Sequence, residues 1–160
     1  MSGTSMDGLD MSLVDVSLNT DYSFEYRIVE SNYEKFDSFT IELINKTIKN
    51  IEYLDALDFH LGKLFCDIVD KYYSKYKIDA ISMHGQTVQH IEKKQSIQSG
   101  NPKFLYERFN VPIIYNFRHA DIVEGGNGAP LMPFLDWLLF RNYSNDVVTL
   151  NIGGISNISF

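Results

Sequence analysis

The chain has 160 residues, of which 44% are hydrophobic and 22% charged, an ordinary composition for one globular domain. Its formal net charge of −7 and the absence of a long basic run argue against nucleic acid or an anionic membrane as the main partner, and no apolar run approaches the roughly 20 residues of a membrane span. The single cysteine, Cys66, excludes an internal disulfide framework and makes a reducing cytoplasm the expected location.

The first part of the chain predicts a hairpin followed by two helices. Apolar and polar residues alternate from Leu9 to Val16, and a second strand is expected at Tyr22–Val29. At Asp37 or Ser38, either of which can cap a helix, the apolar spacing becomes helical. A longer helix is expected from Leu54 to Tyr72, where leucines recur at spacings of three and four.

The rest of the chain alternates strands and helices. A proline after an asparagine at 101–102 predicts the start of a helix that ends near Phe109, and another helix is expected at Met132–Arg141. Strands are expected at Asp79–His84, Val88–Glu92, Ser96–Gln98, Val111–Tyr115, Asp146–Ile152 and Ile155–Phe160. This alternation predicts an α/β fold with a mixed central sheet.

The stretch Phe117–Pro133 combines ionisable side chains with clustered glycines, which favours a loop that approaches a ligand closely. It follows an apolar strand, and α/β enzymes present catalytic groups where strands end. Arg118 is suited to pair with a phosphate, and Asp121 is the candidate general base. His119 is an alternative base, Glu124 is a lesser candidate, and a plain glycine turn with solvated charges is the alternative interpretation.

Three further polar clusters lie at predicted strand ends. Ser2–Asp10 offers hydroxyls, glycines and carboxylates suited to phosphate and magnesium, although any hairpin turn favours such residues. The run 84–87, His-Gly-Gln-Thr, is suited to a sugar ring, and a satisfied histidine near a turn is equally consistent. Asn151–Asn157 contains another glycine turn suited to phosphate. The histidines lack ligand spacing, so no protein-built metal cage is predicted.

Taken in order, these clusters resemble the motifs of the anhydro-N-acetylmuramic acid kinase family, over the whole chain. The resemblance implies the actin-like and hexokinase-like ATPase fold, which is ribonuclease H-like, with ATP and Mg²⁺ bound between two α/β domains. It also implies a reaction in peptidoglycan recycling: the kinase opens the 1,6-anhydro ring of anhydro-N-acetylmuramic acid with water and phosphorylates the 6-hydroxyl.

The resemblance also implies roles for individual residues. Asp121 matches the base that activates the attacking water, and Arg118 is expected near the sugar. The sugar side of the cleft is expected to include His84, Gln86 and Thr87. The residues expected to bind the ATP phosphates and Mg²⁺ are Gly3, Thr4, Ser5, Asp7, Gly8, Asn151, Gly153 and Gly154.

The resemblance further implies a truncated protein. Residues 1–145 are expected to form the first kinase domain without its first strand, and 146–160 the opening strands of the second domain. Asn127 stands where a glutamine is expected. A complementary second half or a second copy is therefore a candidate partner, since open strand edges favour association. The alternatives are an inactive split-gene fragment or remnant that only binds the sugar or a protein partner, and a sugar kinase without ring hydrolysis.

Overall fold

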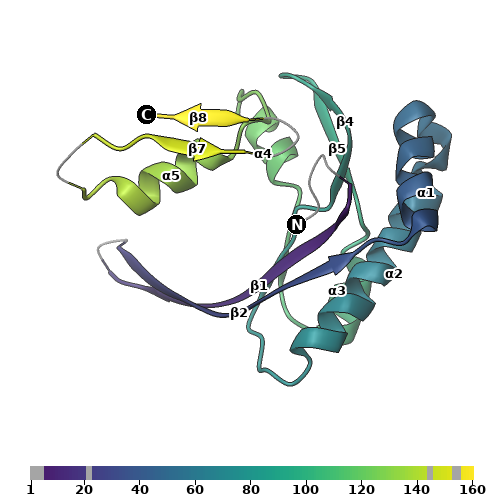
Figure 1. The fold of residues 1–160 in the computed structure, drawn as a ribbon, viewed down its shortest axis with the longest axis horizontal. Helices are drawn as coiled ribbons and strands as arrows, with labels where there is room; N and C mark the ends of the chain where they lie inside the picture. The colour runs from purple at the N-terminus through teal and green to yellow at the C-terminus, as the bar shows by residue number, and fades with distance from the viewer. Residues whose placement is uncertain (1–5, 21–22, 144–145, 153–155) are drawn as a thin grey trace.

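The computed structural model describes residues 6–20, 23–143, 146–152 and 156–160 as a mixture of helices and strands (Figure 1). The strands are β1 (Gly8–Leu18), β2 (Phe24–Lys35), β3 (Ile81–Ser82), β4 (Gln86–Ile91), β5 (Gln95–Ser99), β6 (Ile113–Ile114), β7 (Thr149–Asn151) and β8 (Asn157–Ser159). The α-helices are α1 (Ser38–Lys49), α2 (Leu54–Tyr73), α3 (Lys103–Phe109), α4 (Phe117–Val123) and α5 (Met132–Phe140), and a 3₁₀ turn, η1 (Ile51–Tyr53), joins the first two.

The predicted hairpin is confirmed and is longer than the periodicity indicated. β1 and β2 pair in antiparallel register from Gly8 opposite Lys35 to Leu18 opposite Phe24. The register shifts between Leu13 and Val14, which is a β-bulge. Gly8 is required by packing at the start of the hairpin, because a Cβ there would lie 2.5 Å from the carbonyl oxygen of Glu34.

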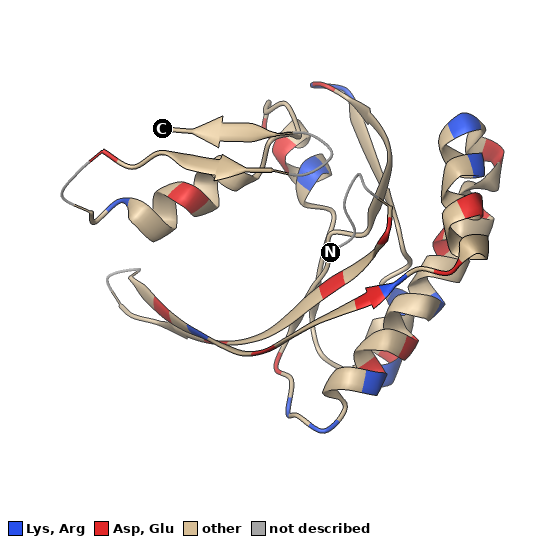
Figure 2. Ribbon diagram, in the orientation of Figure 1, with Lys and Arg blue, Asp and Glu red and all other residues tan. Residues whose placement is uncertain are grey.

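The two predicted helices are confirmed, and they carry the core. Asp37 is the N-cap of α1, where its Oδ1 accepts a hydrogen bond of 2.7 Å from the backbone N–H of Thr40. The core cluster joins the hairpin to both helices and to β4, and its buried members are Leu9, Phe36, Ile44, Leu57, Leu61, Phe65, Ile68 and Val88. Lys, Arg, Asp and Glu are interspersed along α1 and α2, whereas β7 and β8 carry none (Figure 2).

The predicted mixed central sheet is not what the strands form. The described strands pair as four separate two-stranded sheets, β1–β2, β3–β6, β4–β5 and β7–β8. Three pairs are antiparallel, and β3 lies parallel to β6. Each strand of the parallel pair has only two residues, Ile81–Ser82 and Ile113–Ile114, and among the described strands neither pairs with the hairpin.

The stretch at 117–133 was predicted to be a loop, but its first part is helical. α4 contains Arg118 and Asp121, because no helix breaker interrupts the residues from Phe117 to Val123. Gly125, at φ +91°, ends the helix in a left-handed conformation. The N–H of Gly125 donates to the carbonyl of Ile122 and that of Gly126 to the carbonyl of Asp121, at 3.0 and 2.8 Å, which is a Schellman motif.

The remaining helices agree with the sequence within a residue or two. α3 begins at Lys103, and Asn101 still caps it by accepting from the N–H of Lys103 at 3.0 Å. α5 covers the predicted apolar segment, and Pro133 stands in its first turn. Among the described residues, no helix is both long and apolar enough to cross a membrane.

Candidate active site

The parallel pair β3–β6 brings two of the predicted clusters to the same place. The N–H of Ile81 donates to the carbonyl of Pro112 at 3.0 Å, and that of Met83 donates to the carbonyl of Ile114 at 2.9 Å. Because the two strands run in the same direction, their carboxyl ends lie at the same edge. His84 therefore emerges beside the start of α4.

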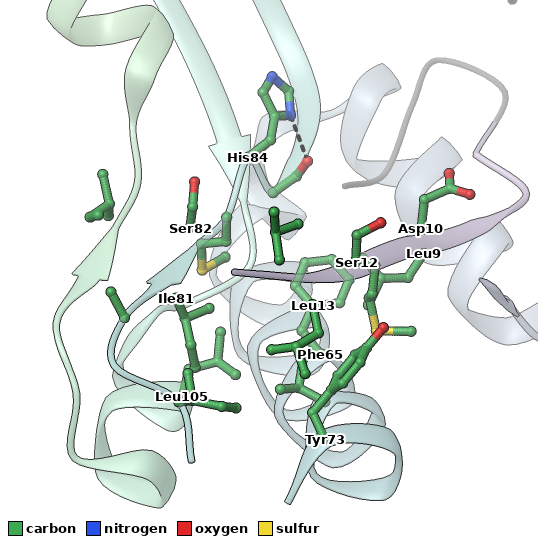
Figure 3. A pocket seen from close by; sticks show the side chains of 18 of the residues that line it. Leu9, Asp10, Ser12, Leu13, Phe65, Tyr73, Ile81, Ser82, His84 and Leu105 are labelled. Atoms are coloured by element: carbon green, nitrogen blue, oxygen red, sulfur yellow. Dashed lines mark hydrogen bonds between the residues drawn. The ribbon is translucent and has the colours of Figure 1, made fainter. Parts of the chain in front are cut away.

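Arg118 and His84 contact each other directly at this edge. The Nε–H of Arg118 donates to Nε2 of His84 at 2.8 Å. On its other ring nitrogen, His84 Nδ1 lies 2.8 Å from the carbonyl oxygen of Gly85, the bond drawn in Figure 3. Arginine has no acceptor and a carbonyl has no proton, so His84 carries its proton on Nδ1 and is neutral.

Burial supports the same protonation state. The pKa of His84 is lowered, mainly by burial of the ring, while its hydrogen bond to Gly85 opposes the shift and the charge of Arg118 adds to it. A protonated imidazole would offer a donor to the donor of Arg118. The neutral ring is therefore a fixed part of the site at neutral pH.

Arg118 and Asp121 together hold both polar backbone groups of Gly128. The Nη1–H of Arg118 donates to the carbonyl of Gly128 at 2.8 Å. The N–H of Gly128 donates to Oδ2 of Asp121 at 2.7 Å. Gly128 is buried and adopts φ +78°, which favours glycine. We call His84, Arg118, Asp121 and Gly128 the glycine clamp.

The glycine clamp leaves one carboxylate oxygen of Asp121 available. The side chain is exposed, and within the described part of the chain Oδ1 makes no hydrogen bond. Gly126 lies so close that a Cβ there would overlap the carboxylate. A carboxylate that is fixed through one oxygen and open at the other has the geometry of a general base.

The predicted sugar-side residues lie in three different surroundings. His84 lines a hollow of about 380 Å³, together with residues of β5 and with Tyr115 and Asn116. Gln86 is buried, and its Nε2 donates to the carbonyl of Thr87 at 3.2 Å. The hydroxyl of Thr87 accepts from Gln98 at 3.3 Å. Of these three predicted residues, His84 belongs to the glycine clamp, whereas Gln86 and Thr87 lie on β4.

The predicted phosphate-binding residues are only partly described. Gly3, Thr4, Ser5, Gly153 and Gly154 lie outside the described residues. Asp7 precedes β1, and its carbonyl accepts from the N–H of Phe36 at 2.9 Å. Tyr33 has a raised pKa, first because of burial and then because of the charges of Asp7 and Asp10, so these carboxylates lie near its ring. Asn151 is exposed at the end of β7, opposite Asn157.

The residues described near the first turn offer Mg²⁺ a carboxylate but no complete protein cage. Within the described ranges, no group of three or more His, Cys, Asp or Glu side chains gathers as a metal cage. Mg²⁺ usually keeps several waters and takes only one or two carboxylates in phosphate sites. The carboxylate of Asp7 is exposed and of the right chemical type, so the residues present fit an ion held mainly by phosphates and water.

Two features of the site were not predicted from the sequence. The backbone of Gly128 is the element that Arg118 and Asp121 hold, although the density of glycines did indicate a close backbone approach. Asn116, at φ +64°, turns the chain between β6 and α4. Its residue type is a usable signal, since asparagine tolerates the left-handed region better than most residues.

Comparison with known proteins assigns the chain to a family. The sequence model of the family described as anhydro-N-acetylmuramic acid kinase matches residues 1–160, the whole chain. The chain belongs to the anhydro-N-acetylmuramic acid kinase family. The predicted resemblance is thereby confirmed, and the mixed α/β structure is consistent with that family's fold.

Curated relatives of the family are longer than this chain. The anhydro-N-acetylmuramic acid kinase of Sulfurimonas denitrificans is 38% identical over 173 residues, which cover 99% of this chain and 45% of the relative. That of Shewanella loihica is 35% identical over 172 residues, with 100% and 45% covered, and that of Caldanaerobacter subterraneus is 32% identical over 184 residues, with 99% and 44% covered. The chain thus spans somewhat less than half of the length of these relatives, in their N-terminal part.

Proposed function

We propose that the candidate active site is the sugar-binding and water-activating part of an ATP-dependent kinase. This kinase hydrolyses the 1,6-anhydro ring of anhydro-N-acetylmuramic acid and phosphorylates its 6-hydroxyl. The observation that carries the proposal is the glycine clamp, which fixes one oxygen of Asp121 and leaves the other exposed. Family membership supplies the substrate class and the use of ATP. The proposed setting is cytoplasmic peptidoglycan recycling.

Asp121 is the base in this proposal. Water attacks the anomeric carbon and gives a proton to Oδ1 of Asp121, while the bond from that carbon to O6 breaks. The released O6 then takes the γ-phosphoryl group, and ADP leaves. Positive charge develops on the sugar ring during ring opening, and the carboxylate of Asp121 stabilises it. The N–H of Gly128 holds the carboxylate in place throughout.

The neutral His84 and the polar groups around it suit recognition of the sugar. His84 lines the hollow of about 380 Å³, which is large enough for part of a sugar ring. Arg118 is hydrogen-bonded to His84 and to Gly128, so its proposed role is to hold these two residues in position. Gln86 and Thr87 remain proposed sugar-side residues on the adjoining strand.

The nucleotide side is proposed from family membership and from the predicted motifs. Asp7 would hold Mg²⁺ through water, and the ion would neutralise charge on the phosphates during transfer. Gly3, Thr4, Ser5, Gly8, Asn151, Gly153 and Gly154 are the proposed phosphate-binding residues. Residues 1–145 are the proposed first domain and 146–160 the start of the second. A complementary polypeptide or a second copy is the proposed partner for completing the cleft.

The test is turnover in a chimera in which residues 1–160 replace the matched part of the Sulfurimonas denitrificans relative. We expect the chimera to convert the anhydro sugar and ATP into the 6-phosphate and ADP. Asp121→Asn should lower kcat by at least about 10²-fold, since a general base contributes 10² to 10⁴. The control is Glu124→Gln, an exposed carboxylate at the end of the same helix, which should leave kcat unchanged.

A contrary result is equally clear. If Glu124→Gln lowers kcat and Asp121→Asn does not, the assignment of the base is wrong. If the chimera folds and binds the sugar without turnover, the second candidate gains: a remnant that only binds its ligand. The observation that favours a binding-only remnant is the location of Gln86 and Thr87 on β4, outside the glycine clamp.

A further inference from the structure

The hollow beside His84 is lined by polar side chains that do not belong to the glycine clamp. Its volume is about 380 Å³, and residues of β5, the turn before α3 and Asp58 of α2 form part of its wall. His84 itself offers the hollow no free ring nitrogen, because Nδ1 donates to Gly85 and Nε2 accepts from Arg118. Recognition of a polar ligand in the hollow therefore falls to other side chains.

Four of the polar residues that line the hollow are poorly suited to this recognition. Nε2 of Gln98 already donates to the hydroxyl of Ser96 at 2.7 Å and to that of Thr87 at 3.3 Å. Oε1 of Gln98 has no partner among the described residues, but it is fully enclosed, so a ligand in the hollow does not meet it. Tyr115 and Asn116 are exposed, and no hydrogen bond within the described part of the chain fixes their side chains.

Asp58 is the carboxylate of the hollow, and one of its oxygens is fixed. Oδ1 accepts from the N–H of Gly100 at 2.9 Å, and the backbone carbonyl of Asp58 accepts from the N–H of Asn101 at 3.1 Å. Among the described residues, Oδ2 accepts no hydrogen bond, and the side chain is half-buried. Asp58 therefore brings a firmly held, unpaired acceptor to the hollow.

Asn101 supplies a matching donor on the same wall. Its Oδ1 accepts from the N–H of Lys103 at 3.0 Å, whereas its Nδ2 makes no hydrogen bond within the described ranges. The backbone of Asn101 approaches α2 closely because residue 62 is glycine: a Cβ on Gly62 would lie 2.7 Å from the carbonyl oxygen of Asn101. This close packing and the bonds to Asp58 hold the acceptor and the donor on neighbouring parts of the wall.

We propose that Asp58 and Asn101 bind the 4-hydroxyl of the anhydro sugar and so determine which sugars the site accepts, an inference that rests on the proposed sugar-binding function. A hydroxyl both donates and accepts, so one oxygen atom can donate to Oδ2 of Asp58 and accept from Nδ2 of Asn101. In 1,6-anhydro-N-acetylmuramic acid the bridge occupies C1 and C6, an acetamido group C2 and a lactyl ether C3. The hydroxyl at C4 is therefore the one that the ring leaves free.

The other polar groups of the sugar fit this pair of side chains less well. The lactyl carboxylate only accepts hydrogen bonds, and the carboxylate of Asp58 repels it. The N–H and C=O of the acetamido group point in opposite directions, because its amide is planar and trans, so they do not meet two neighbouring side chains together. A site built to pair with a hydroxyl discriminates strongly against a sugar that lacks it.

The first test compares two sugars on the unmodified 160-residue chain by calorimetric titration. The 4-deoxy derivative should bind at least about tenfold more weakly than 1,6-anhydro-N-acetylmuramic acid, because Asp58 and Asn101 both lose their partner. Absence of binding by the parent sugar would contradict the proposed function together with this inference. Equal binding of the two sugars would contradict this inference alone and leave the sugar-binding function standing.

Exchange of the two side chains tests the location. Asp58→Asn keeps an oxygen for the N–H of Gly100 and replaces the unpaired oxygen by a donor, so binding should weaken at least about tenfold. Asn101→Asp keeps an oxygen for Lys103 and replaces the donor by an acceptor, with the same expected loss. The double variant D58N/N101D again offers one donor and one acceptor, and it should bind within about threefold of the native chain.

The control variant and a local readout separate binding from folding. Asp55→Asn should bind as the native chain does, since Asp55 is exposed in the first turn of the same helix and does not line the hollow. The amide of Gly100 should be as protected from hydrogen exchange in Asp58→Asn as in the native chain. Weak binding by both single variants, with no recovery in the double variant, would make the two residues structural and would overturn the proposal.

Discussion

The two parts of this chain differ in what holds them together. Every buried hydrophobic residue described lies between Leu9 and Leu105. Beyond that, α4 and α5 contain no buried residue, although α5 is strongly apolar, and its Phe134 and Trp137 are 68% and 54% exposed. The candidate site is therefore held by hydrogen bonds and a Schellman turn, whereas the hairpin and α1–α3 share a packed core.

This difference has a consequence for how the site responds to change. The stability that comes from hydrophobic burial does not depend on pH. A closely packed core is instead sensitive to changes in side-chain volume. A site held by His84, Arg118 and Asp121 depends on their protonation and on the exact path of the backbone at Gly128. Substitutions and pH should therefore separate the two parts experimentally.

The largest effect should come from the core. Leu61 is completely buried, and Leu61→Ala should lower the free energy of unfolding by about 2–5 kcal/mol, through lost burial and a cavity. Leu135 on α5 is 42% exposed, and Leu135→Ala should cost less than about 1 kcal/mol. Urea denaturation followed by circular dichroism measures both. Equal costs would show that α5 is as well packed as α2.

The next effect should appear at the glycine clamp. Gly128→Ala forces an L-residue to φ +78° and places a Cβ 2.8 Å from the side chain of Ile122, so a loss of about 1–3 kcal/mol is expected. Gly125→Ala is the matched control, since its φ is +91° and nothing lies within 4 Å of the added Cβ. Urea denaturation should rank Gly128→Ala as the more damaging. The reverse order would mean that Gly128 is not closely packed.

His84 gives the site a pH dependence near neutrality. Its folded pKa is lowered, mainly by burial, so between that value and the ordinary one near 6.5 the unfolded chain binds more protons. Stability is therefore full above about pH 6.5 and falls as the pH drops through the folded pKa. Urea denaturation of the native chain should show this loss, and His84→Gln should remove it.

The exposed His119 is the control for that experiment, because His119→Gln should keep the native pH dependence. The proton resonances of the His84 ring should also titrate below the ordinary histidine value near 6.5, because burial lowers the pKa of His84. A His84 titration at or above the ordinary value would contradict the neutral ring that the contact with Arg118 requires.

The smallest effect concerns the cap of α1, in the packed part of the molecule. Hydrogen bonds from the side chain and backbone of Thr40 lower the pKa of Asp37, while burial opposes the shift. This stabilisation is present above the unfolded pKa near 3.9 and is lost as the pH falls through the lower folded value. Asp37→Asn should cap equally well and lose the acid sensitivity. Urea denaturation at pH 3 and 7 measures this loss of stability in the native chain and in Asp37→Asn. If the variant lost as much stability at pH 3 as the native chain does, Asp37 would not be the source of the acid sensitivity.

The elements set by local patterns were predictable from the sequence, and those set by distant pairing were not. The hairpin, α1, α2, α3 and α5 follow from alternation, helical spacing and caps within a few residues of their observed bounds. The separation of the strands into four pairs depends on contacts between distant segments, and the local spacing of apolar residues does not indicate which strands pair. α4 was missed because its terminal glycines, which end a helix, were interpreted as a loop.

The site shows the same division. The positions of His84 and Arg118 after two apolar strands predicted that both lie at strand ends, and the parallel pairing of β3 with β6 explains their contact. The bond from Gly128 to Asp121 depends on the path of a turn that no residue pattern specifies. Family motifs added the identity of the candidate base, which chemistry alone left open between Asp121 and His119.

The most direct test of the central claim is calorimetric titration of the 160-residue chain with 1,6-anhydro-N-acetylmuramic acid. The account predicts saturable binding at one site, weakened at least about tenfold by Arg118→Ala, which removes the two hydrogen bonds that Arg118 makes to His84 and Gly128. Arg108→Ala, on the exposed face of α3, should bind as the native chain does. Absence of binding in the folded chain, or equal binding by the two variants, would contradict the claim that the glycine clamp organises a sugar site.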